Sequence, residues 1–131
     1  MKIFIADAFT TVHFSGNQAG VVLLEEGEDF PEAAWMQKLA AELKHSETAF
    51  VRRPSERAFQ ICYFTPDGEV ELCGHATIAA FTVLREERII TPGICRLSTM
   101  AGELEIEVSE HAVWMDMAPP REARRFSEEE T

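Results

Sequence analysis

The amino-acid sequence predicts an α+β fold in which a mixed, mostly antiparallel β-sheet wraps around one apolar helix. Segments with strand character occupy both ends of the chain. A central segment, residues 74–86, is apolar on every side until its first charge at Arg85, and a second segment, residues 31–44, is amphipathic. A helix with no polar face cannot meet water, so we expect the central helix in the core.

The N-terminal part of the chain is predicted to form two strands followed by the amphipathic helix. Residues 2–9 and 21–24 have strand character, and a turn at 15–17 separates them. Pro31 suits the first turn of a helix. Apolar residues then recur every four positions, so residues 31–44 should form a structural helix with one face on the sheet. The residues of this stripe are Trp35, Leu39 and Leu43, with Met36 and Ala40 beside them.

The remaining strands flank the central helix on both sides. Before it we expect a pair of strands joined by a turn at 54–56, and after it a three-stranded meander. In the meander, glutamates at 103, 105 and 107 alternate with apolar residues, which gives one wet face and one core face. The predicted strands are residues 47–52, 57–64, 96–99, 102–108 and 112–117. We assign residues 1–118 to one domain and 119–131 to a polar tail or a truncated linker.

Length and composition indicate a single domain with a substantial core. The 131 residues are 46% hydrophobic, and a chain of this size buries about two-thirds of its unfolded surface. There are 12 basic and 23 acidic residues, for a formal net charge of -11. This charge repels nucleic-acid phosphates and anionic lipid, so we expect neither nucleic acid nor a membrane as a partner.

Three cysteines, Cys62, Cys73 and Cys95, have no Cys-x-x-Cys spacing. Their odd number and spacing argue against a disulfide framework and against a structural zinc site. The histidines also lack the His-x-x-x-His spacing of metal ligands, so we predict no metal. An early aspartate interrupts any signal-peptide core, and a cytoplasmic location is expected.

The start of the central helix is the first candidate site. The first amides of a helix have no partner within it, so a Gly74-His75 entry offers donors and a positive dipole end to an anionic group such as a carboxylate. His75 alone fits a neutral, structural helix cap as well as a catalytic group. Cys73 is either a thiol activated by the helix N-terminus or, more commonly, a buried unreactive one.

Glu47 is the second candidate, because it lies where the amphipathic helix gives way to an apolar strand. Apolar neighbours would place it in a dry pocket, where it could exchange protons near neutral pH. The alternative is an ordinary carboxylate that faces solvent at the start of a strand.

Five ordered segments resemble the N-terminal half of the phenazine biosynthesis PhzF-like family, which is related to diaminopimelate epimerase. The similarity extends over nearly the whole chain, up to residues 117–119. The segments are residues 7–10, 14–22, 46–51, 63–66 and 73–77.

The resemblance implies a cofactor-independent isomerase or epimerase. The family's acid/base glutamate falls on Glu47 and its helix-start histidine falls on His75. The amides from Gly74 to Ala76 would hold the carboxylate of a small substrate, and Asn17 and Ser46 are weaker candidates for substrate contacts.

The family is about twice as long as this chain, and its C-terminal half completes the pocket. The resemblance therefore implies a homodimer or a partner that supplies a C-terminal half. Three functions stay open: an isomerase completed by a second half, a non-catalytic binding or structural half-domain, and a thiol-based amino-acid epimerase that uses Cys73.

Overall fold

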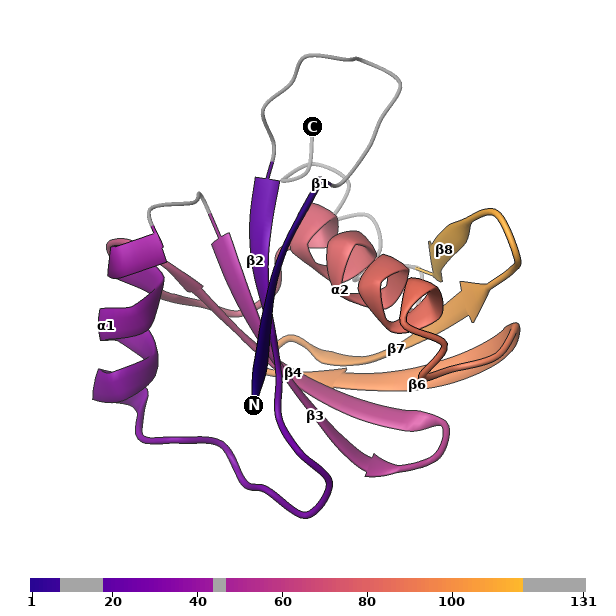
Figure 1. Ribbon diagram of the computed structural model, residues 1–131, viewed down its shortest axis with the longest axis horizontal. Coiled ribbons are helices and arrows are strands. Elements are labelled where there is room, and N and C mark those ends of the chain that lie inside the picture. Colours follow the sequence, from indigo (N-terminus) through magenta and orange to yellow (C-terminus); the bar gives the residue numbers. More distant parts are fainter. Residues whose placement is uncertain (8–17, 44–46, 117–131) are drawn as a thin grey trace.

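A computed structural model of the chain describes residues 1–7, 18–43 and 47–116, and it confirms the predicted α+β fold (Figure 1). Two helices accompany one mixed sheet, and neither described helix is long and apolar enough to cross a membrane. The helices are α1 (Ala33–Leu43) and α2 (Gly74–Glu86). The strands are β1 (Lys2–Asp7), β2 (Gln18–Leu23), β3 (Glu47–Ser55), β4 (Ala58–Thr65), β5 (Gly68–Val70), β6 (Gly93–Thr99), β7 (Gly102–Val108) and β8 (Val113–Asp116).

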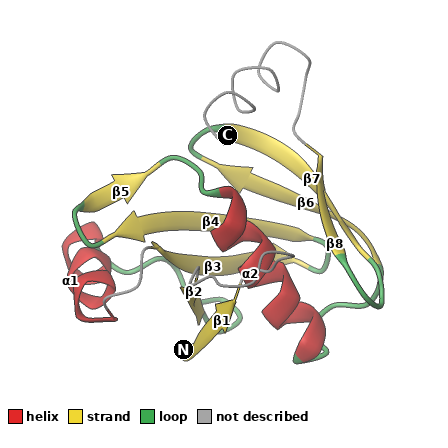
Figure 2. Ribbon diagram, turned by 90° about the horizontal axis from the view of Figure 1, so that it is seen from above, coloured by secondary structure: helices red, strands yellow, loops and turns green. Residues whose placement is uncertain are grey.

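The strands form one sheet in the order β1-β2-β3-β4-β6-β7-β8, with β5 paired to β4. The pairs β2/β3 and β4/β6 are parallel, and the other pairs are antiparallel. The sheet curves around α2, while α1 lies on its other face (Figures 1 and 2). This arrangement agrees with the predicted sheet wrapped around the central helix.

The core lies between the concave face of the sheet and α2. Small residues on α2, including Ala76, Ala79 and Ala80, are fully buried and let the helix approach the strands closely. Phe81 of α2 packs edge-to-face on Phe59 of β4, with ring centroids 5.2 Å apart. Burial of one phenylalanine side chain contributes about 1.5–3 kcal/mol, so this contact helps fix the helix on the sheet.

A smaller core holds α1 against the outer face of the sheet. Met36 and Ala40 are buried against Val22, Phe50 and Phe64. Both helix residues belong to the predicted apolar face, and Leu39 packs beside them. Trp35 is 45% exposed, because the helical repeat centres the buried face on Met36 and Ala40 and leaves the indole at its margin.

Two local features of the strands differ from the prediction. The turn expected at 54–56 lies at residues 56–57, and β3 continues through Pro54. The register shifts between Arg52 and Ser55, and such a bulge accommodates a proline that cannot donate to the ladder. The short strand β5 was not predicted, since three residues carry too little periodicity. The expected turn at 15–17 and tail at 119–131 lie outside the described residues.

Candidate functional site

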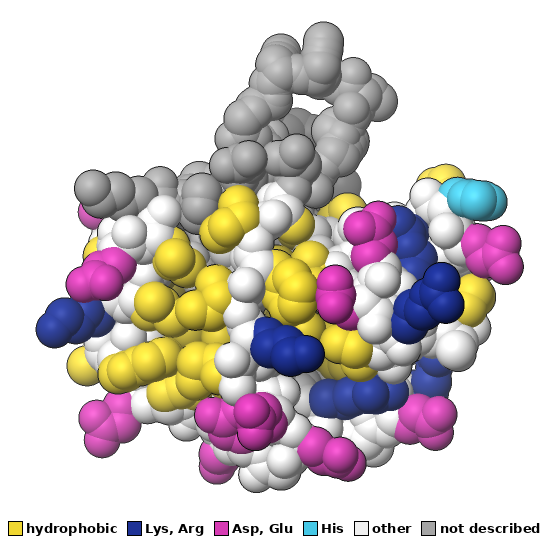
Figure 3. Space-filling view, viewed as in Figure 1, with side chains coloured by type: hydrophobic (Ala, Val, Ile, Leu, Met, Phe, Trp, Pro, Cys, Tyr) yellow, Lys and Arg dark blue, Asp and Glu magenta, His cyan; other side chains and the backbone are white. Residues whose placement is uncertain are grey.

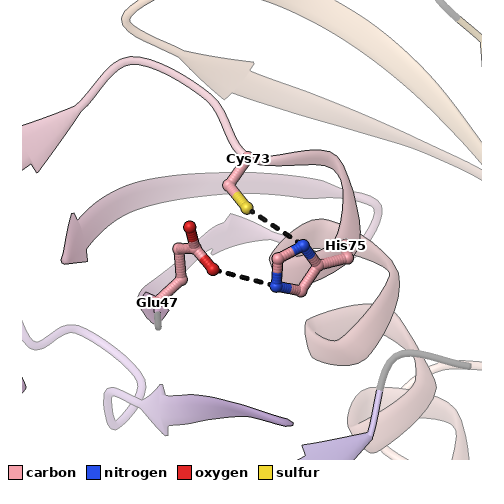
Figure 4. A group of neighbouring side chains, drawn as sticks. All are labelled: Glu47, Cys73 and His75. Carbon is pink, nitrogen blue, oxygen red and sulfur yellow. Dashed lines mark hydrogen bonds and ion pairs between the residues drawn. The ribbon is translucent and has the colours of Figure 1, made fainter. Parts of the chain in front are cut away.

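The start of strand β3 and the N-terminus of α2 meet at a cluster of three side chains (Figure 4). Glu47 is the first residue of β3, and His75 is the second residue of α2. Glu47 Oε1 lies 2.8 Å from His75 Nε2. The two residues singled out from the sequence therefore face each other at the N-terminus of the buried helix.

Cys73 contacts the opposite nitrogen of the same imidazole. Its Sγ lies 3.6 Å from His75 Nδ1, so the ring lies between a sulfur and a carboxylate (Figure 4). The contact with Cys73, followed by that with Glu47, raises the pKa of His75 to about 10, while burial acts in the opposite direction. At neutral pH the ring is thus an imidazolium with an N–H on each nitrogen.

The backbone at the start of α2 places Cys73 and His75 on the same side. Cys73 is the N-cap residue and has an extended backbone, with φ -134° and ψ 117°. Its carbonyl accepts two hydrogen bonds from Thr77, one from the amide at 3.0 Å and one from the hydroxyl at 2.8 Å. The N-cap residue is therefore fixed through its backbone, and its side chain stays available to His75.

A buried tyrosine ties this helix start to the sheet. Tyr63 of β4 is fully buried, and its hydroxyl contacts Thr77 Oγ1. Because the Thr77 hydroxyl proton is directed to the Cys73 carbonyl, Tyr63 is the donor in this contact. Sequence reasoning missed both positioning residues. The signal was there: the chain's single tyrosine, and a threonine in the first turn of an apolar helix.

The first three residues of α2, whose amides were predicted to bind a carboxylate, differ in their exposure. The Thr77 N–H bond to the Cys73 carbonyl is the first intrahelical bond, so the amides of Gly74, His75 and Ala76 precede it. Gly74 and His75 are partly exposed, whereas Ala76 is fully buried. A ligand at this surface would reach the first two residues more readily, and a role for Ala76 stays a prediction.

Glu47 is less isolated from water and charge than we expected. Its side chain is 18% exposed and faces the imidazole of His75, not a purely apolar pocket.

A cavity of about 540 Å³ opens near the C-terminal end of α2, lined in part by Leu84 and Ile89, and it includes none of the three clustered residues. Asn17 and Ser46, the weaker candidates, lie outside the described residues.

Sulfur, imidazole and carboxylate are also the donor types of a transition-metal site. One ligand atom from each of Glu47, Cys73 and His75 lies within 4.8 Å of the others, a grouping that the sequence spacing did not predict. However, Nδ1 faces the sulfur and Nε2 faces the carboxylate, and one ion can bind only one of these nitrogens. The present geometry fits a hydrogen-bonded chain better than a coordination shell.

Comparison with known proteins identifies the family of the chain. The family model described as phenazine biosynthesis-like protein, PhzC-PhzF, matches residues 6–129. The phenazine biosynthesis-like domain-containing protein of Bos taurus is 41% identical over 124 residues, which cover 89% of this chain and 42% of that protein. The uncharacterized isomerase YddE of Escherichia coli K12 is 39% identical over 112 residues, or 84% of this chain and 36% of that protein.

A solved structure extends the likeness to three dimensions. The crystal structure of a phenazine biosynthesis protein of the PhzF family from Enterococcus faecalis superposes with a TM-score of 0.75 at 33% identity. The match covers 86% of this chain and 42% of that chain. The chain thus spans well under half the length of these relatives and has the fold of their isomerase and epimerase-like group. Sequence and fold together show that the chain belongs to the PhzC/PhzF phenazine biosynthesis-like family.

Proposed function

We propose that this chain is the N-terminal half of a cofactor-independent isomerase that moves a proton on a small carboxylate-bearing substrate. One observation carries the proposal: the Glu47 carboxylate lies 2.8 Å from the His75 imidazole at the start of the buried helix. The naming of a relative as an isomerase supports this reaction class. We expect the protein to act in the cytoplasm.

We assign different tasks to the two residues. An imidazolium has no free lone pair, so His75 can donate a proton or a hydrogen bond but cannot remove a proton. Glu47 is then the group that takes a proton from a substrate carbon and returns it. The partly exposed amides at Gly74 and His75, with the helix dipole behind them, would hold the substrate carboxylate.

A complete site requires groups on the far side of the substrate. Proton transfer needs positioned groups within hydrogen-bond reach, and the chain covers 42% of the Bos taurus relative and 36% of the Escherichia coli one. We propose that a C-terminal half, or a second copy of this chain, supplies the missing wall.

Exchange of substrate hydrogen with solvent deuterium tests this function. The chain, alone and with a C-terminal half added, would be incubated in D₂O with a dihydro-hydroxyanthranilate, the substrate class that the resemblance to the phenazine-pathway enzyme implies. A panel of amino acids would be tested separately, and label at carbon would be followed by mass spectrometry. We expect label with one of these classes, and Glu47→Gln should reduce its rate by about a hundredfold or more. Glu103→Gln, on a glutamate 64% exposed on β7, is the matched control and should leave the rate unchanged.

The same experiment separates the two other functions. Because Cys73 contacts His75, a thiol-based epimerase is the second candidate, and Cys73→Ala would then abolish exchange as fully as Glu47→Gln. Such an enzyme needs a second thiol, and neither Cys62 nor Cys95 belongs to the described cluster of Glu47, Cys73 and His75. Binding of a carboxylate without any exchange, even when a C-terminal half is added, would instead favour a non-catalytic half-domain.

A further inference from the structure

The three clustered side chains stand in the order thiol, imidazole, carboxylate. Cys73 Sγ is 3.6 Å from His75 Nδ1, and His75 Nε2 is 2.8 Å from Glu47 Oε1. A thiol beside a positively charged imidazole, with a third group fixing that ring, is an arrangement that favours the reactive thiolate. We propose that Cys73 is a covalent modification site, whose sulfur is paired with the His75 ring and attacks peroxides and alkylating electrophiles.

The arrangement supplies each part that such a reaction needs. The extended N-cap backbone and the two Thr77 bonds fix the Cys73 carbonyl, so the sulfur is held beside the ring. Glu47 fixes the ring from its other nitrogen. Cys73 and His75 are both partly exposed, so a small reagent can approach this end of the helix. The proposal holds whether or not the chain isomerises a substrate.

The other two cysteines lack this arrangement and serve as internal references. Cys95 is fully buried, and its burial raises the pKa of its thiol. Cys62 is partly buried beside the α1 core, where burial and, secondarily, the charge of Glu69 raise its pKa to about 11. Both effects keep those thiols protonated and unreactive near neutral pH.

The two reactions balance without any further reagent. With iodoacetamide, a sulfur–carbon bond forms, the carbon–iodine bond breaks to release iodide, and the thiol proton passes to water. With hydrogen peroxide, a sulfur–oxygen bond forms and the oxygen–oxygen bond breaks. The thiol is oxidised to sulfenic acid, the peroxide is reduced to water, and an added thiol can reverse the change through a disulfide.

Either adduct would alter the candidate site. A group added to the sulfur lies beside the imidazole that pairs with Glu47. It removes the sulfur as a partner for Nδ1 and occupies space at the helix start. Oxidants or electrophiles would therefore block whatever ligand binds there, and the reversible sulfenic acid would make the block temporary.

Site-resolved labelling of the folded 131-residue chain tests the proposal. The protein, free of reductant, is treated with iodoacetamide or hydrogen peroxide at neutral pH, and each cysteine's rate is measured by peptide mass spectrometry. We expect Cys73 to react at least about tenfold faster than Cys62, with Cys95 slower still. In urea the three rates should become equal, because the difference arises from the fold.

Two variants assign the effect to the cluster. His75→Gln should slow Cys73 alkylation by about tenfold or more, while His111→Gln, at an exposed histidine distant in sequence, should not change it. If Cys73 in the chain without substitutions reacts at a rate within about twofold of that of Cys62, the proposal is wrong. This comparison does not depend on the folding of any variant. An unchanged Cys73 rate in a folded His75→Gln protein would also overturn it.

Discussion

His75 is held from both sides, and this determines which residue can do which chemistry. Sulfur at one nitrogen and a carboxylate at the other stabilise the protonated ring. The pKa of His75 therefore lies well above the ordinary range for histidine. A protonated ring can donate a hydrogen bond to a ligand group that takes the place of the sulfur, or to one that binds beside the carboxylate. Within the described cluster, Glu47 is then the group suited to accept a proton.

The positions of Glu47 and His75 could be predicted from the sequence, but the sulfur contact could not. Both residues lie at boundaries between elements, where short motifs are informative. The approach of Cys73 to His75 depends on a side-chain rotamer and on an N-cap backbone conformation. That conformation is stabilised by contacts from Thr77 and, through it, Tyr63, which sequence spacing does not reveal.

At the scale of the elements, the chain of hydrogen bonds from Tyr63 through Thr77 to Cys73 joins β4 to the start of α2. We predict that Thr77→Val lowers the free energy of unfolding by about 1–3 kcal/mol, because it removes the bond to Cys73 and leaves a buried tyrosine hydroxyl without its acceptor. Tyr63→Phe should cost about 1 kcal/mol, since the Thr77 bond to Cys73 remains. Urea denaturation measures both.

Thr82→Val is the matched control, because Thr82 lies on the same helix and is partly exposed. It should change the unfolding free energy by less than about 0.5 kcal/mol. An equal effect of Thr77→Val and Thr82→Val would show that the link between β4 and α2 contributes nothing specific.

Elements with a long, uniform pattern could be predicted well. The central helix begins and ends where its apolar run and flanking glycine and glutamate indicated, at Gly74 and Glu86. The errors occur where a local exception overrides the pattern, as at the Pro54 bulge, or where an element is too short, as at β5. Tertiary packing, and not propensity, selected Met36 over Trp35 as the buried face of α1.

At the scale of the whole molecule, one face combines exposed apolar residues with an outer strand of the described sheet. Ile3 and Ile5 of β1 are 48% and 46% exposed, and hydrophobic side chains gather on the face that carries α1 and β1 (Figure 3). Apolar surface of this kind is typical of a face that meets another protein. It fits the expectation that a second half or a second copy covers part of this chain.

We predict that the isolated chain forms a dimer in solution at micromolar concentration. Analytical ultracentrifugation measures the mass, and Ile5→Lys should weaken association by about tenfold or more, because it places a charge on the apolar face. Glu107→Lys, on the wet face of the meander, is the control for the change of net charge. A monomer over the whole concentration range would contradict a homodimer and leave a C-terminal half as the expected partner.

Both proposals depend on the place of His75 between Cys73 and Glu47, so the decisive measurement is the charge state of its ring. Nitrogen-15 NMR of the imidazole, followed from about pH 6 to 11, reports whether each ring nitrogen carries a proton. We predict a doubly protonated ring at neutral pH, with a pKa of about 10 that falls in Cys73→Ser, since the sulfur contact contributes most. A ring that loses its proton near the ordinary pKa of about 6.5 would contradict the account.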